Sequence, residues 1–413
     1  MDFCRDRKLT LVSTVGMTVF MAARANEAGY AITAQDFFNE LRLDPSEAPS
    51  KQAFADARKK ILWQAYEYLL SEARRDDLET PWLGHRVRIA DGTRLNTPNS
   101  RDLRRHFSIP NNKAGAGFFP QAWLVTLLNS VSGQPIAAKV GCHRNDSERD
   151  LMLGLLDACE HGDVVLLDRG LGGANVYLRF YERGLHFVHR VKTSGDHAAG
   201  YVQEFLRSKR KSQVCAVPVK ADDGTEIVMW VRLVLGPIDS DRKRIVFATN
   251  LLDEDCYSVG AIRELYRKRW AIETTYGRVK NLLAVEKFHA KTYNGVMQEI
   301  FANLFVLSLT AIVATEAAIA LRLDRAVVTP NFKAVLHVVR RHFRVIVESE
   351  KISLKQAALT AETMIEEAGR ILWKLQPGRS YPRVSKQPIK VHNLCKNKKL
   401  AAFRRRRRKR RAP

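Results

Sequence analysis

The chain has 413 residues, of which 46% are hydrophobic and 27% are charged. This composition allows a large core or two to three domains, and it excludes a disordered, collagen-like or disulfide-stapled protein. Its 68 Lys and Arg against 44 Asp and Glu give a formal charge of +24, and residues 386–413 alone hold 13 basic and no acidic side chains. The tail and the rest of the chain are both basic, so we expect a polyanionic partner, with nucleic acid ahead of an anionic membrane.

The six cysteines are scattered and include no C-x-x-C pair. That spacing argues against a zinc site and against a disulfide framework, and it favours a reducing cytoplasm.

Two apolar stretches imitate membrane signals. Residues 9–23 follow basic residues like a short signal peptide, but acidic residues precede them and Thr and Ser interrupt the apolar run. Residues 301–322 contain Asn303, Glu316 and Arg322. We therefore expect two buried helices and no membrane-spanning segment.

The first 80 residues read as helical. We expect helices near 9–28 and 33–42, a turn at 43–49, and a helix at 50–61 for which Ser50 is the N-cap. The last of these carries Lys51, Gln52, Arg58, Lys59 and Lys60. It suits either a helix-turn-helix reader of DNA or a solvated amphipathic helix, and the segment alone favours the second interpretation.

From residue 85 the pattern becomes one of alternating strands and helices. We predict strands at 85–91, 122–128, 134–140, 163–168 and 185–191, with helices at 147–160 and 173–183 between the later ones. This order predicts an α/β layer with a mixed sheet.

Residues 192–247 predict a β-rich insertion in that layer. Two Val-rich alternating runs flank the turn Asp222-Asp223-Gly224, which is a strong hairpin signal. A strand at 244–249 returns to the core, and Ser258 can cap a long helix that reaches Leu283. Further helices are expected at 296–322, 331–347 and 353–375, ahead of an arginine-rich disordered arm.

The helix at 259–283 carries the most informative pattern. At about 100° per residue, four polar side chains fall within a stripe about 60° wide; they are Tyr266, Arg269, Glu273 and Lys280. Gly277 lies on the same stripe, where a missing side chain lets a phosphate backbone approach. Apolar residues including Leu265, Ile272 and Val279 form the opposite, core-facing side. The alternative is a charged solvated face with helical ion pairs, for which a Tyr and an interior Gly are poor choices.

Two aspartates end predicted strands. Asp91 begins Asp-Gly-Thr, and Asp168 begins Asp-Arg-Gly. Alone, each is a common turn starter; together with Glu273 they offer three carboxylates, the hard oxygen ligands that two Mg²⁺ ions need for phosphoryl transfer. Glu148 and Asp150 are read as helix-start residues that complement the helix dipole.

These motifs resemble the DDE transposases of bacterial insertion sequences, in particular the insertion-sequence-four family with its Y-R-E-K signature. The likeness extends over most of the chain, including the opening FCRDRKL, SKQAFADARKKI at 50–61 and QEIFANLFVLSLTA at 298–311. It implies a ribonuclease-H-like catalytic core with a β-rich insertion, flanked by helical regions at both ends. The implied division is an N-terminal DNA-binding region (1–80), a core in two parts (81–191 and 248–330), the insertion (192–247), a C-terminal helical region (331–400) and a tail (401–413).

The resemblance also implies residue roles. Asp91, Asp168 and Glu273 are then the catalytic metal ligands for Mg²⁺, with Mn²⁺ as a substitute, and Tyr266, Arg269 and Lys280 hold DNA phosphates. Trp230 in the insertion is either a platform for a flipped base or a strand core residue, and Trp270 either belongs to the motif or simply packs.

The function implied is cut-and-paste transposition at terminal inverted repeats by a homodimer in the bacterial cytoplasm. Two alternatives remain open from the sequence: a ribonuclease-H-like nuclease that cuts without joining, and a non-catalytic DNA-binding protein.

Overall fold

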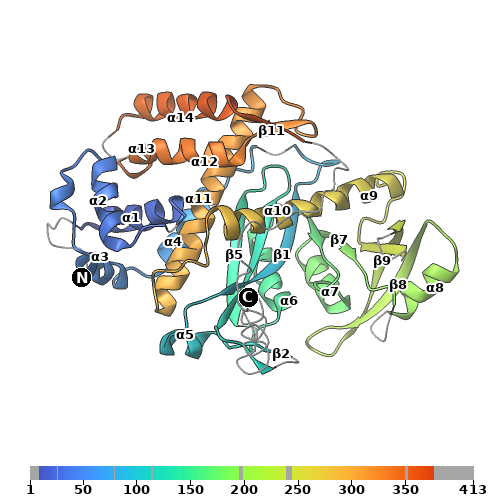
Figure 1. Ribbon diagram of the computed structural model, residues 1–413. Helices are drawn as coiled ribbons and strands as arrows, with labels where there is room; N and C mark the ends of the chain where they lie inside the picture. The colour runs from blue at the N-terminus through green and yellow to red at the C-terminus, as the bar shows by residue number, and fades with distance from the viewer. Residues whose placement is uncertain are drawn as a thin grey trace, which may run out of the picture.

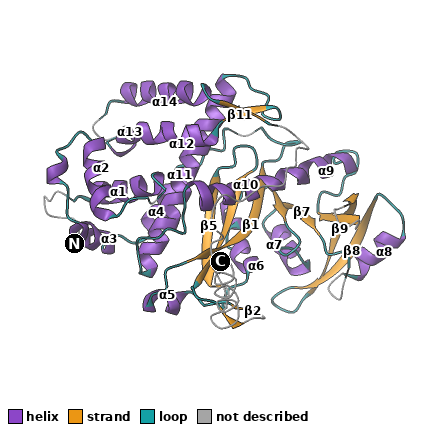
Figure 2. Cartoon of the chain, in the orientation of Figure 1, coloured by secondary structure: helices purple, strands orange, loops and turns teal. Residues whose placement is uncertain are grey.

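The computed structural model describes residues 9–375 except for short gaps at 26, 79, 113–114, 143, 195–198, 239–243 and 349–351. Eight strands form one central sheet (Figure 2). They are β1 (Val87–Asn96), β4 (Gln121–Asn129), β5 (Pro135–Cys142), β6 (Val164–Leu167), β7 (His186–Arg190), β8 (Ser212–Lys220), β9 (Glu226–Ile238) and β10 (Arg244–Thr249). Their order across the sheet is β5-β4-β1-β6-β7-β10-β9-β8.

The first five strands form the ribonuclease-H-like core that the sequence predicted. Strands β5, β4 and β1 are antiparallel, whereas β1, β6 and β7 run parallel to one another. The parallel strands are joined through α6 (Glu148–Leu153) and α7 (Ala174–Glu182). The helix predicted at 147–160 is shorter than expected, because α6 ends at Gly154 and only a 3₁₀ turn, Leu156–Ala158, follows.

The β-rich insertion continues this sheet and does not form a separate layer. Strand β10 pairs antiparallel with β7, and β9 pairs with both β10 and β8. The predicted hairpin turn lies between β8 and β9, where Gly224 has a φ of 86°. A helix that the sequence did not suggest, α8 (Gly200–Arg207), packs on β8.

Helices cover both faces of the sheet. Apolar residues of α6, α7 and α8 share one core with the inward side chains of one face, and α9 (Val259–Arg267), α10 (Ala271–Gly277) and α11 (Tyr293–Ala320) cover the other. In Figure 1 the α9–α10 segment crosses the sheet above β1, and α11 runs between the sheet and the outer helices.

Four N-terminal helices pack on the same core through α11. They are α1 (Leu11–Ala23), α2 (Tyr30–Glu40), α3 (Lys51–Lys59) and α4 (Gln64–Glu72), and Ser50 caps α3 as predicted. Arg58, one of the cations considered for reading DNA, is buried instead and pairs with Glu299 of α11 at 3.0 Å. Burial takes its charge off the surface, so Arg58 attaches α3 to the core.

Helix α11 is the one helix among the described residues with the length and composition to cross a membrane. Its most apolar stretch is 67% buried inside the protein, as expected for a core helix.

The C-terminal helices are shorter than the sequence suggested. They are α12 (Phe332–Arg341), α13 (Phe343–Val347) and α14 (Leu354–Gly369). The helix expected to reach residue 375 is wrong at its end: after Gly369 the chain forms β12 (Leu372–Lys374), which pairs with β11 (Val328–Pro330). The apolar and aromatic side chains after a helix-ending Gly suit an extended strand. The arginine-rich tail and the start of FCRDRKL lie outside the described residues.

Candidate active site

The two aspartates predicted to end strands lie next to each other, but only Asp168 follows the end of its strand. The prediction that the first strand ends at Asp91 is wrong, because β1 continues to Asn96 through its pairing with β4; only its pairing with β6 stops at Ala90. Strands β1 and β6 are parallel, with Ala90 opposite Leu167. Asp91 follows Ala90, and Asp168 follows Leu167 directly after β6. Because the pairing of β1 with β6 ends at Ala90 and Leu167, the next residues, Asp91 and Asp168, lie side by side where β6 stops.

The segment at 259–282 is helical throughout but changes its winding twice. It comprises α9, a 3₁₀ turn at Lys268–Trp270, α10, and a π turn at Arg278–Leu282. Ser258 accepts a hydrogen bond from the Ala261 N–H, so it is the predicted N-cap. The predicted core face is buried, as its members Leu265, Ile272 and Val279 show.

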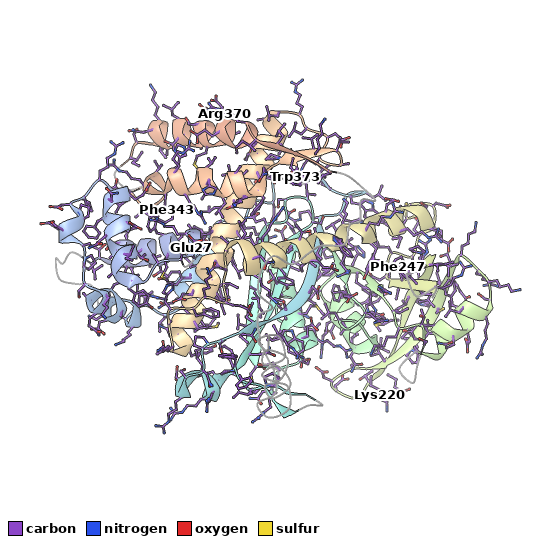
Figure 3. All side chains as sticks on the ribbon, in the orientation of Figure 1. Glu27, Lys220, Phe247, Phe343, Arg370 and Trp373 are labelled. Atoms are coloured by element: carbon purple, nitrogen blue, oxygen red, sulfur yellow. The ribbon has the colours of Figure 1, made fainter. Side chains whose placement is uncertain are left out.

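This helical segment brings two of the four signature residues to the strand ends. The Tyr266 hydroxyl donates to the Leu167 carbonyl at 3.1 Å, and its ring packs on Phe247 of β10 with centroids 4.5 Å apart. Figure 3 shows Phe247 beneath this segment. Arg269 lies over the aspartates: its guanidinium is 3.6 Å from Asp91 Oδ2.

The other two signature residues, Glu273 and Lys280, also make contacts close to Asp91. Glu273 Oε1 accepts a hydrogen bond from Arg269 at 3.0 Å, so one guanidinium joins Glu273 to Asp91. Lys280 Nζ donates to Thr93 Oγ1 at 2.6 Å, two residues beyond Asp91 on β1. A Cβ built at Gly277 would meet nothing within 4 Å, so this stretch of the helix leaves open space.

Burial controls the electrostatics of these groups. It raises the pKa of Asp91 to about 6, to which the charges of Asp168 and Glu273 add, while the Gly92 N–H and Arg269 oppose the rise. Burial also raises the pKa of Tyr266 and lowers the pKa of Lys280. The charged form of Asp91 is therefore disfavoured by burial and by the neighbouring carboxylates, and Arg269 offsets only part of this cost.

The donor set fits a hard divalent cation. Asp91, Asp168 and Glu273 offer only oxygen ligands, and Asp91 is held in a partly desolvated position where a cation lowers its cost of ionisation. In the described part of the chain no three acidic, His or Cys side chains converge on one point as they stand. In this arrangement Arg269 supplies the positive charge between Asp91 and Glu273.

The two candidate tryptophans differ in their distance from this cluster: Trp230 lies on the insertion, whereas Trp270 follows Arg269 in the helical segment. Trp230 is on β9, three strands from β6, and 55% of it is exposed, so the structure excludes the alternative of a strand core residue. Trp270 is 66% exposed within the 3₁₀ turn, so it does not pack.

Sequence reasoning missed two residues of the site. The hydroxyl of Tyr276, on α10, donates to the Asp91 carbonyl and so supports the backbone at that aspartate. Glu148, at the start of α6, lies against Gly92. In sequence Glu148 follows the N-cap Ser147, so the sequence indicates an ordinary helix-start residue. Nothing in its sequence distance from Asp91 indicates that the two residues lie close together.

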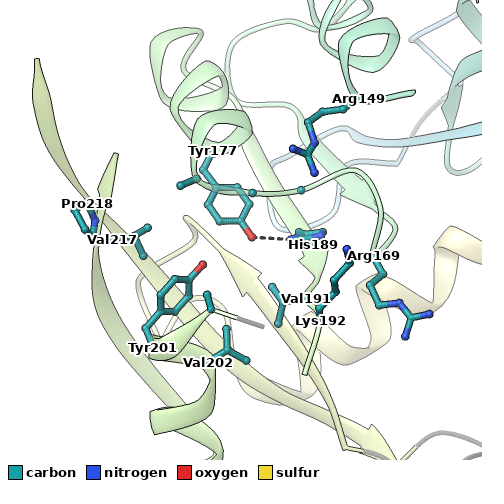
Figure 4. A pocket seen from close by; sticks show the side chains of 14 residues that line it. Arg149, Arg169, Tyr177, His189, Val191, Lys192, Tyr201, Val202, Val217 and Pro218 are labelled. Carbon is teal, nitrogen blue, oxygen red and sulfur yellow. Dashed lines mark hydrogen bonds between the residues drawn. The ribbon is translucent and has the colours of Figure 1, made fainter. Parts of the chain in front are cut away.

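A positively charged pocket of about 520 Å³ lies next to Asp168 (Figure 4). Arg149, Arg169 and Lys192 line it, and the described lining residues include no acidic side chain. Deeper inside, the Tyr177 hydroxyl and His189 Nδ1 are 2.6 Å apart. Arg169 follows Asp168 in sequence, so this cationic surface continues from the candidate site.

A comparison with known families decides what this arrangement is. The family model described as transposase DDE domain matches residues 82–309, more than half of the chain and the whole of the cluster above. The chain belongs to the DDE transposase family. As a DDE transposase it is an enzyme of DNA recombination, with the nuclease and strand-transfer chemistry of that family and its use of divalent metal ions.

Comparisons with curated proteins and with solved structures add less. No curated protein matches the transposase. Among solved structures it is similar to a piggyBac transposase synaptic complex with hairpin DNA determined by cryo-electron microscopy, at 11% identity and a TM-score of 0.45, over 88% of this chain and 79% of that one.

Proposed function

We propose that this protein is a cut-and-paste DNA transposase of the insertion-sequence-four family, with Asp91, Asp168 and Glu273 as its catalytic residues. The observation that carries the proposal is the meeting of Glu273 and Asp91 on one guanidinium, that of Arg269. These carboxylates are far apart in sequence, and a structural helix has no need of a second carboxylate from the sheet at this point.

The three carboxylates would hold Mg²⁺, or Mn²⁺ in its place. Divalent ions held there would supply positive charge for the phosphate and for the deprotonated nucleophile in an in-line displacement. Asp91 would contribute from within β1, Asp168 from the end of the neighbouring strand β6, and Glu273 from the helix above them.

Tyr266, Arg269 and Lys280 have a different role, which is to position DNA phosphates. Each lies on the side of the helical segment that faces the strand ends. Arg269 would exchange its carboxylate partners for a phosphate when the ions bind, because Glu273 cannot hold the ions and pair fully with Arg269 at the same time. Trp230, exposed on the insertion, would stack on an unpaired base near the transposon end.

The reaction has two displacements. Water attacks a phosphodiester at each transposon end and expels the 3′-oxygen, which leaves as a 3′-hydroxyl. That hydroxyl then attacks a phosphodiester of target DNA, expels the target strand's own 3′-oxygen as a hydroxyl, and joins the element to the target's 5′-phosphate. Both ends must be processed together, so a homodimer holding two terminal inverted repeats is proposed, acting in the bacterial cytoplasm. The N-terminal helices would contribute to end recognition, and the arginine-rich tail would add salt-sensitive affinity.

A cleavage assay on DNA carrying the element's own ends, with Mg²⁺, tests the proposal. Wild type should give cut and joined products, and Glu273→Gln should give neither while still retarding the DNA on a native gel. Glu264→Gln is the matched control, because Glu264 is on the adjoining helix and forms an exposed ion pair with Arg267 at the surface. Cleavage without joining would make the protein a nuclease, and DNA binding without cleavage by wild type would overturn the catalytic assignment.

A further inference from the structure

Glu148 touches the strand that carries the first aspartate. A Cβ built at Gly92 would lie 2.3 Å from Glu148 Oε1 and 2.9 Å from its Cδ, both far inside contact distance. The missing side chain at Gly92 therefore makes the space that the Glu148 carboxylate occupies. Gly92 has no left-handed φ that would require glycine for the backbone's sake.

The contact lies on the opposite side of β1 from Glu273. Successive side chains of a strand point to opposite faces, and Asp91 faces Arg269 and α10. Glu148 reaches Gly92 from α6, which packs on β4 and β1 from the other face. The Asp91–Gly92 position of β1 is thus flanked by one carboxylate from each covering layer.

Glu148 also belongs electrostatically to the cluster. Its charge interacts with those of Asp91 and Asp168. Within the described residues it has no basic partner at ion-pair distance; Arg94, the cation that acts on it, has its guanidinium over the Trp123 ring, 5.1 Å from the ring centroid. A half-buried carboxylate beside two others is unfavourable unless a cation joins them.

We propose that Glu148 is a fourth metal-holding residue of the transposase, supplying an oxygen from the α6 side of β1. The proposal rests on the proposed function, since it adds a ligand to the site made by Asp91, Asp168 and Glu273. Gly92 has a defined role in this site, because its missing side chain leaves room for the Glu148 carboxylate beside Asp91.

Titration of the full-length protein with Mn²⁺ alone, by calorimetry or electron paramagnetic resonance of free Mn²⁺, provides the test. Glu148→Gln keeps the shape and an oxygen for the Gly92 N–H but removes the charge. We expect it to weaken the tightest Mn²⁺ site about tenfold or more, a loss of the size seen when groups supporting a metal site are removed. Asp157→Asn is the matched control, because Asp157 is exposed and forms a surface ion pair with Arg183; the variant should bind Mn²⁺ as wild type does.

A second variant separates position from charge. Gly92→Ala leaves Glu148 ionised but displaces its carboxylate, so it should also weaken Mn²⁺ binding while the protein keeps its circular dichroism spectrum. It keeps the test informative if Glu148→Gln fails to fold.

Asp91→Asn distinguishes the possible failures. If Asp91→Asn loses Mn²⁺ binding and both Glu148→Gln and Gly92→Ala bind as wild type does, Glu148 is not a ligand and the three-carboxylate site stands. If wild type itself binds no Mn²⁺, both this inference and the metal-dependent function are overturned.

Discussion

Arg269 donates a hydrogen bond to Glu273 Oε1 at 3.0 Å while its guanidinium lies 3.6 Å from Asp91 Oδ2. One fixed cation is therefore shared by two proposed metal ligands, and a divalent ion must compete with it.

Replacing Arg269 should change metal binding and DNA binding in opposite directions. In Arg269→Gln the carboxylates lose their countercharge, so we expect a lower melting temperature without metal and a larger rise on adding Mn²⁺ than in wild type. DNA retention should fall, because a phosphate contact is gone. Differential scanning fluorimetry with and without Mn²⁺ measures the first effect. An unchanged Mn²⁺-induced rise would mean that Arg269 does not compete with the ion.

Lys280 should contribute one phosphate contact. Its ammonium donates a hydrogen bond to Thr93 in the middle of β1, and burial lowers its pKa, so a DNA phosphate that binds there would pair with a partly desolvated cation. Lys280→Ala should weaken binding to all duplexes similarly and reduce the slope of log K against log salt by about one. Lys355→Ala, on the exposed side of α14, serves as control. Equal slopes for wild type and Lys280→Ala would remove Lys280 from the interface.

The buried pair of Arg58 and Glu299 should dominate the attachment of α3 to the core. The two side chains are 4% and 1% exposed, and Glu299 also accepts the N–H groups of His289 and Ala290. Glu299→Gln leaves a buried guanidinium unpaired, so we expect a loss of about 3–5 kcal/mol in the free energy of unfolding.

Urea denaturation measures that loss. The control is Glu316→Gln, also on α11, whose pair with Arg75 is partly exposed and should be worth about 1 kcal/mol or less. Similar losses in the two variants would contradict the special role of the buried pair.

His189 should make the protein less stable in mild acid. Burial lowers the pKa of His189 to about 4, below the value of about 6.5 for an unfolded chain. Below about pH 6.5 the unfolded state binds a proton at His189 and the folded state does not. The contribution of His189 to the free energy of unfolding is therefore complete above about pH 6.5 and is lost as the pH falls toward 4. The loss amounts to up to about 3 kcal/mol. Urea midpoints from pH 7.5 to 5 should fall less steeply for His189→Gln; parallel curves would contradict the assignment.

The site was predictable from the sequence where it depends on local order. Asp168 follows a strand because an apolar run precedes it and turn residues follow, and the helical period put Tyr266, Arg269, Glu273 and Lys280 on one stripe opposite Leu265, Ile272 and Val279. The same pattern at Asp91 misled, because β1 continues past Asp-Gly-Thr by pairing with β4. The stripe survives a 3₁₀ turn and a π turn because the first winds the chain more tightly and the second more loosely, so their effects partly cancel.

What the sequence by itself determined is the set of elements and the candidate carboxylates, since both follow from spacing and side-chain type along short segments. Tertiary structure alone decided which groups meet. Glu148 and Tyr276 reach Gly92 and Asp91 through the packing of α6 and α10. Arg58 is buried because Glu299 of α11 supplies its carboxylate. The insertion extends the main sheet because β10 pairs with β7. Such contacts link residues tens to hundreds of positions apart, and no local pattern of hydrophobicity or charge specifies the partner of a group once it is buried.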